Sequence, residues 1–140
     1  MHRLRSAPIA LAFAALCIHQ IGCSHSKAVP DVSKDTYLGP PVALDGSGQS
    51  YVVVAKSPSP GWVATLDRVA EQYRHKAVFV SLRRPNPSYY YPQVQVEQRI
   101  GTSVLTPETV KVYVRVLAFD EAAGGQPYAL GAENKAPQKP

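Results

Sequence analysis

The chain has 140 residues, with 15 Lys and Arg against 10 Asp and Glu, so its formal net charge is +5. Its basic residues form no stripe: the two clusters, Arg83-Arg84 and the run from Arg74 to Lys76, are short. Clusters of this size usually belong to a solvated face, so we expect no nucleic-acid partner.

The first 22 residues have the pattern of a secretory signal peptide. Arg3 and Arg5 supply positive charge, and residues 7–18 form a nearly unbroken apolar run. That run is shorter than the roughly 20 apolar residues that a membrane-spanning helix needs. We therefore expect residues 1–22 to direct export and then to be removed, which leaves a less basic mature chain.

The end of this segment carries a candidate lipidation site. Ile21-Gly22-Cys23-Ser24 resembles the lipobox of bacterial lipoproteins, in which a small residue precedes a cysteine that becomes acylated. The other cysteine, Cys17, lies within the signal, so Cys23 would be the only mature cysteine. The resemblance implies a lipid anchor on Cys23 in the cell envelope, and Ser24 rather than Asp implies the outer membrane of a Gram-negative host. The alternative is ordinary cleavage after Ala28.

Two flanking segments lack the apolar density of a folded core. Residues 23–47 alternate Pro and Gly with Ser, Lys and Asp, which predicts a flexible tether after the cysteine. Val42–Leu44 could still pack locally or add an edge strand. Residues 121–140 contain Gly124-Gly125 and several Pro, which predicts a disordered tail. The remainder, residues 48–120, would form one domain.

The domain contains four segments typical of β-strands. Residues 51–55 and 77–82 are short Val-rich runs, each followed by a proline-containing segment. Residues 92–100 and 109–119 alternate apolar and polar side chains, as a strand with one buried face does.

The segment 60–74 is ambiguous between a helix and a strand. Its apolar residues from Trp62 to Tyr73 fall on one face at helical spacing, and Ser59 with Pro60 is a suitable helix start. As a strand, the segment alternates imperfectly. Periodicity alone therefore favours a helix, and a buried Trp62 would contribute much to so small a core in either case.

A series of short motifs within residues 51–97 bears on this choice. The motifs are an apolar strand, a glycine turn, two more strands, a proline loop and a Tyr-Pro pair: Tyr51–Val54, Pro60–Trp62, Val63–Val69, Val78–Leu82, Pro85–Pro87 and Tyr91–Pro92. Their order and spacing resemble the C-terminal domain of the PrcB family, lipoprotein subunits that stabilise a surface protease complex. The resemblance implies a strand at 63–69 and a function in docking on another protein.

These observations predict an all-β domain, a small antiparallel β-sandwich or open barrel of about five strands. The alternative is an α+β layer in which residues 60–74 form a helix on the sheet.

The mature chain offers few residues for catalysis or metal binding. It keeps His25 in the tether and His75 in a charged turn, and it has no Gly-x-Ser-x-Gly motif. No pair of histidines or cysteines stands at metal-ligand spacing, and Asp45–Gly48 lacks the further acidic residues of a calcium loop. We therefore expect no catalytic site, metal, cofactor or small-molecule substrate.

The candidate partner-binding residues are Arg83, Arg84, Tyr89, Tyr90 and Tyr91. Tyr and Arg are enriched in binding hot spots, and the prolines nearby would hold the loop extended. Alternatively, the outer two tyrosines could pack on the core at a strand entry while the middle one is exposed.

Three functions are compatible with the sequence. The expected one is a membrane-anchored envelope lipoprotein whose β domain binds or stabilises a partner protein without catalysis. A structural module that binds cell-wall glycan is the first alternative. A hydrolase whose site is not recognisable in the sequence is the second.

Overall fold

The computed structural model describes residues 29–134. The predicted signal peptide 1–22 and the lipidation site Cys23 lie outside the described residues. None of the residues from 29 to 134 forms a helix long and apolar enough to cross a membrane. The secondary structure of this part consists of seven strands: β1 (Val42–Asp45), β2 (Ser50–Ser57), β3 (Val63–Gln72), β4 (His75–Arg83), β5 (Val96–Leu105), β6 (Val110–Leu117) and β7 (Ala129–Asn134).

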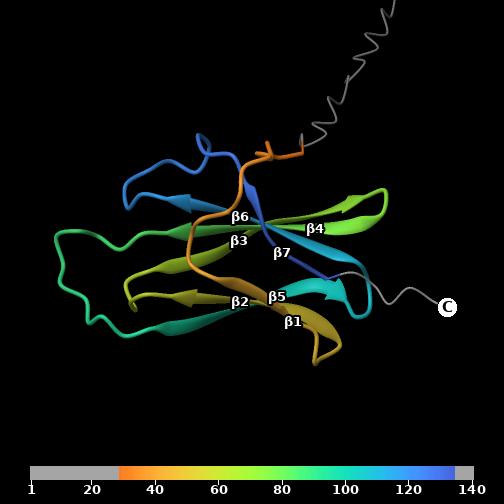
Figure 1. Cartoon of the computed structure of the whole chain (residues 1–140), viewed down its shortest axis with the longest axis horizontal. Coiled ribbons are helices and arrows are strands. Elements are labelled where there is room, and N and C mark those ends of the chain that lie inside the picture. Colours follow the sequence, from red (N-terminus) through yellow and green to blue (C-terminus); the bar gives the residue numbers. More distant parts are fainter. Residues whose placement is uncertain (1–28, 135–140) are drawn as a thin grey trace, which may run out of the picture.

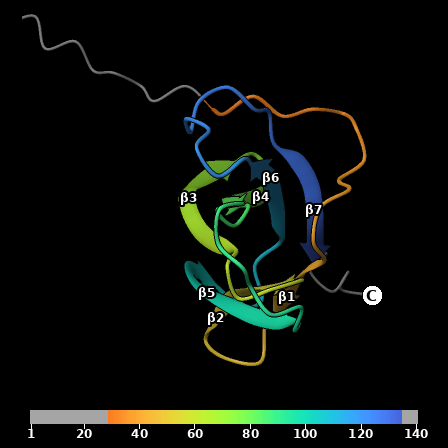
Figure 2. The ribbon, with the colours of Figure 1, turned by 90° about the vertical axis from the view of Figure 1, so that its left-hand side faces the viewer.

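The strands form two facing sheets, which are seen end-on in Figure 2. One sheet has the order β1-β2-β5 and the other the order β3-β4-β6-β7. The predicted all-β sandwich is confirmed, with more strands than the five or so expected. One pair of neighbouring strands, β4 and β6, is parallel. After β4 the chain crosses to the other sheet, forms β5 there, and returns as β6 in the same direction as β4 (Figure 1).

Residues 63–72 form strand β3 and not the alternative helix. The reason for the imperfect alternation is a β-bulge at Asp67, where the pairing with β4 shifts between Leu66 and Arg68. Leu66 packs on the core before the bulge and Val69 packs on it after the bulge. This spacing of three residues imitates a helix, although the whole segment is a β-strand.

The predicted tether and tail each contribute a strand. Val42–Asp45 is the edge strand β1, as its apolar residues allowed. Ala129–Asn134 pairs with β6 as β7, so the prediction of a disordered tail is wrong for these residues. β7 consists mainly of small and polar residues, so it carries no apolar pattern, and it joins the sheet by backbone pairing with β6. Residues 135–140 lie outside the described residues.

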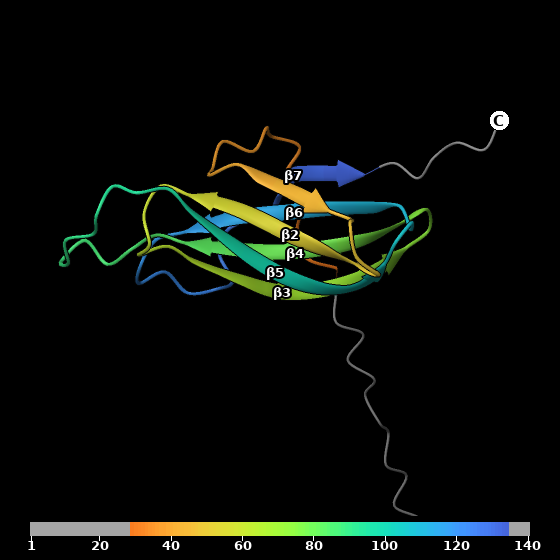
Figure 3. The ribbon, with the colours of Figure 1, turned by 90° about the horizontal axis from the view of Figure 1, so that it is seen from below.

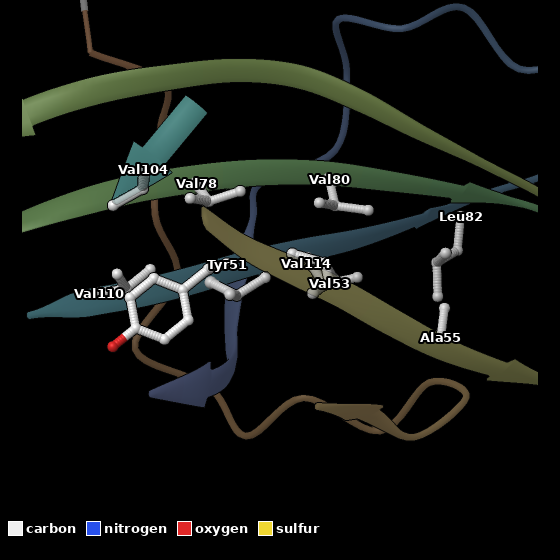
Figure 4. Packing of buried hydrophobic residues seen from close by; sticks show 10 residues of the cluster. Tyr51, Val53, Ala55, Val78, Val80, Leu82, Val104, Val110 and Val114 are labelled. Carbon is white, nitrogen blue, oxygen red and sulfur yellow. The ribbon is translucent and has the colours of Figure 1, made fainter. Parts of the chain in front are cut away.

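The core fills the space between the sheets (Figure 4). It is built mainly from Val. Most of these residues come from β2, β4 and β6, whose side chains alternate between a face turned to the core and the opposite face. Burying one such side chain contributes about 1.5–3 kcal/mol, which makes these strands the main source of stability. The fully buried inner residues include Val53, Ala55, Val78, Val80, Leu82, Val110 and Val112.

Candidate binding surface

Three loops lie together at one end of the sandwich. They are the β2–β3 turn (residues 58–62), the β4–β5 loop (residues 84–95) and the β6–β7 loop (residues 118–128). Figures 1 and 3 show the β4–β5 loop extending furthest beyond the strands. The β3–β4 hairpin, with His75, lies at the opposite end (Figure 1).

The β4–β5 loop carries the three tyrosines, and they do not share one environment. Tyr89 and Tyr90 are 67% and 92% exposed. Tyr91 is half-buried, and its ring lies so close to Gly61 that a Cβ there would be 2.6 Å from two ring carbons. Tyr91 therefore anchors the loop on the β2–β3 turn, whereas the other two tyrosines face solvent.

Local contacts fix the tip of this loop. The side-chain oxygen of Asn86 accepts a hydrogen bond of 2.9 Å from the Ser88 amide, and its carbonyl accepts one of 3.2 Å from the Tyr89 amide. Such an Asx turn orders the backbone that leads to the tyrosines. Pro85 and Pro87 restrict the same segment further.

Arg83 braces the neighbouring loop and is not a free binding group. Its Nη1 donates hydrogen bonds to the carbonyl oxygens of Ala118, Phe119 and Glu121 at 2.9, 3.0 and 2.8 Å. The Glu121 carboxylate in turn accepts a 2.9 Å hydrogen bond from the Ala118 amide, which lowers the pKa of Glu121. Arg84, by contrast, is exposed. Of the five candidate residues, Arg84, Tyr89 and Tyr90 are thus the ones available to a partner.

An open groove of about 880 Å³ lies beside these loops. Its walls come from the segment 36–40, the β2–β3 turn, the β4–β5 loop and the end of β6. Trp62 lines it while also packing on the core, so this residue is only partly buried. No local pattern in the sequence indicates the groove, because its lining residues come from segments far apart in the chain.

Tyr37 fixes the wall formed by the N-terminal segment. Its hydroxyl donates a 2.8 Å hydrogen bond to the Pro40 carbonyl, and burial raises the pKa of Tyr37 well above its usual value. Its ring also lies near Gly131 of β7. The phenol therefore stays neutral and serves as a structural support for the groove.

A polar cluster on the outer face of the larger sheet was also not predicted. Arg115 donates from Nε to the Ser81 hydroxyl at 2.7 Å, and Ser81 donates to Asp67. The Tyr128 hydroxyl donates to the same Asp67 carboxylate at 2.9 Å, and the Arg115 guanidinium lies 4.4 Å from the centre of the Tyr128 ring. Burial, and then the bond to Asp67, raises the pKa of Tyr128.

The chemistry of this cluster is that of a structural network. Among residues 29–134 no imidazole lies beside Ser81 to accept its proton, and the Asp67 carboxylate already interacts with Ser81, Tyr128 and Arg115. The network joins β3, β4 and β6 to the segment before β7. It thereby supports the end of β6 that lines the groove.

The histidine and acidic residues do not form a metal site in the described part of the chain. No group of three or more His, Cys, Asp and Glu side chains between residues 29 and 134 is placed to hold a metal ion. Burial and the nearby Lys111 lower the pKa of His75, and its Nε2 is buried without a hydrogen-bond partner. Both effects favour the neutral imidazole over the imidazolium.

Comparison with known proteins adds no relative. No family model matches the chain. No curated protein and no solved structure matches it either.

Proposed function

We propose that the chain is a membrane-anchored envelope lipoprotein whose β domain binds and stabilises a partner protein without catalysing a reaction. The observation that carries this proposal is the exposure of Tyr89 and Tyr90 on a loop that is otherwise fixed. Two solvent-facing tyrosines supply large contact area, and a loop that is already ordered loses little entropy on binding.

The anchor and the type of partner rest on the two sequence resemblances. The lipobox-like Cys23 would attach the mature chain to the membrane. The likeness of residues 51–97 to the PrcB family suggests a protein as the partner. The loop end of the sandwich, with Tyr89, Tyr90 and Arg84, is the docking surface in this proposal.

A photo-crosslinking experiment in the native host tests the docking surface. A benzophenone side chain replaces Tyr90 in one variant and Tyr73 in a matched control. Tyr73 is 94% exposed but lies in the β3–β4 hairpin, at the opposite end of the sandwich (Figure 1). We expect a crosslinked product of one discrete mass from position 90 and none from position 73.

Equal crosslinking at both positions, or none at position 90, would contradict the proposal. Retention on isolated cell wall gives a separate measurement. If wild-type protein is retained and the variant Tyr89→Ala/Tyr90→Ala is not, the surface binds glycan and not a protein.

A further inference from the structure

Strand β6 extends beyond its neighbour β7. The pairing between them ends where Ala129 stands opposite Val114, whereas β6 continues to Leu117. The residue that would stand opposite Val116 is Pro127, which has no N–H to donate to the Val116 carbonyl. No backbone hydrogen bond joins these two described residues in the other direction either. The end of β6 is therefore an open strand edge, and both Val116 and Pro127 line the groove.

The backbone of Val116 faces this open edge. The Thr109 and Leu117 carbonyls accept hydrogen bonds of 2.9 Å from the Lys76 and Arg84 amides, so odd-numbered residues of β6 turn their backbone groups toward β4. Even-numbered residues turn theirs to the other side, because backbone direction alternates along a strand. The N–H and C=O of Val116 consequently point along the sheet into the groove.

The charged residues that line the groove are basic, which favours an acidic ligand over a basic one. Arg84 and Arg115 line it, and none of the described lining residues is Asp or Glu. Arg115 already pairs with Asp67, whereas the Arg84 side chain is exposed. Arg84 is therefore the cation that can meet a carboxylate at the rim, in a groove whose wall is otherwise formed largely by Trp62 and prolines.

We propose that this groove binds an extended, acidic segment of a partner protein by adding it to the edge of β6. The backbone of the segment pairs with the N–H and C=O of Val116, a carboxylate meets Arg84, and an apolar side chain packs on Trp62. Edge addition of this kind takes affinity from backbone hydrogen bonds and specificity from pockets for side chains. The inference rests on the proposed function, because it takes the partner to be a protein.

The test begins with a random peptide library displayed on phage and selected against the full chain from residue 23, with Cys23→Ala to prevent acylation. Trp62 is the only tryptophan in the chain, so its fluorescence reports directly on the groove. We expect enriched peptides that contain Asp or Glu and that change the Trp62 emission saturably. Their affinity should fall with rising salt, because the Arg84 contact is at an exposed rim.

Two comparisons locate the binding. Arg84→Glu should weaken the enriched peptides about tenfold or more, whereas Arg74→Glu, an exposed arginine at the opposite end, should change affinity by less than about twofold. N-methylation of single peptide amides should abolish binding at the amide that pairs with the Val116 carbonyl and have little effect at its neighbours. Because this second comparison alters the peptide, it does not depend on a protein variant that must fold.

Failure of this inference can be told apart from failure of the proposed function. If no acidic peptide is enriched, or if Arg84→Glu and Arg74→Glu act alike, the groove inference is wrong. If crosslinking at Tyr90 still captures one product of discrete mass, the docking surface stands without it. If both experiments are negative, the proposed function falls as well.

Discussion

The side chain of Gln98 on β5 hydrogen-bonds the backbone of Ala64 on β3, across the gap between the two sheets. Its Oε1 accepts a 2.8 Å bond from the Ala64 amide, and its Nε2 donates a 2.7 Å bond to the Trp62 carbonyl. The side-chain amide of Gln98 thus links β5 to β3, two edge strands that do not pair through their backbones. It also holds Trp62 in the wall of the groove.

Loss of this bridge is expected to destabilise the domain and loosen Trp62. In Gln98→Ala the partly buried Ala64 amide loses its partner, so the free energy of unfolding should fall by about 1–3 kcal/mol. Chemical denaturation followed by Trp62 fluorescence measures both effects, since a more exposed indole emits at longer wavelength. Gln95→Ala, at an exposed position just before β5, is the control and should leave both quantities unchanged. Equal behaviour of the two variants would show that the bridge is unimportant.

Gly61 is expected to be necessary for the fixed conformation of the tyrosine loop. A Cβ at this position would lie 2.6 Å from the Tyr91 ring and 2.7 Å from the Pro85 side chain. Gly61→Ala should therefore displace Tyr91, cost about 1–3 kcal/mol and speed hydrogen exchange in residues 84–95. Gly101→Ala is the matched control, because a Cβ at Gly101 would meet nothing within 4 Å.

The control should be neutral or stabilising by up to about 1 kcal/mol, since alanine restricts the unfolded chain. If hydrogen exchange in the loop is the same in Gly61→Ala as in wild type, Tyr91 does not anchor the loop.

The strands whose residues form simple patterns could be predicted from the sequence. Val-rich runs and clean alternation identified parts of β2, β4, β5 and β6. The bulge at Asp67 obscured β3, because an inserted residue shifts the apolar pattern by one. β6 pairs in parallel with β4 because the chain crosses to the other sheet as β5 before it returns, and no local sequence pattern indicates that crossing.

The candidate site was predictable only in part. The exposure of Tyr90 follows from its place in a polar, proline-rich loop. The packing of Tyr91 on Gly61 and the three bonds of Arg83 join segments some 30 or more residues apart, so neither pattern nor spacing could indicate them. The open edge at Val116 did have a local sign, namely the proline at 127, but its meaning depends on the register of β7.

Stability should depend on pH through the ion pair between Asp45 and Arg99. The hydrogen bond from Arg99 lowers the pKa of Asp45 to about 2, below the value of about 3.9 for an unfolded chain. Because the folded-state pKa is the lower one, the stabilisation is complete above about pH 4 and disappears as the pH falls through about 2.

Asp45→Asn provides the measurement. The denaturation midpoint of wild type should exceed that of Asp45→Asn at pH 6, and the difference should largely vanish near pH 2. Both side chains of the pair are substantially exposed, so added salt should reduce the difference at pH 6. A difference that stays constant from pH 6 to pH 2 would mean that the Asp45 carboxylate is not responsible.

The proposed lipid anchor on Cys23 is tested by comparing wild type with Cys23→Ala in an exporting bacterial host. If Cys23 is acylated, the wild-type protein should carry the mass of the acyl chains and sediment with membranes, because each buried CH₂ contributes about 0.8 kcal/mol. Cys23→Ala should lose both properties while the β domain keeps its denaturation midpoint. A wild-type product that begins near Val29, remains in the soluble fraction and matches the variant would instead indicate cleavage after Ala28. The proposed docking surface would then belong to a freely secreted domain, and the search for a partner would move from the membrane to the surrounding fluid.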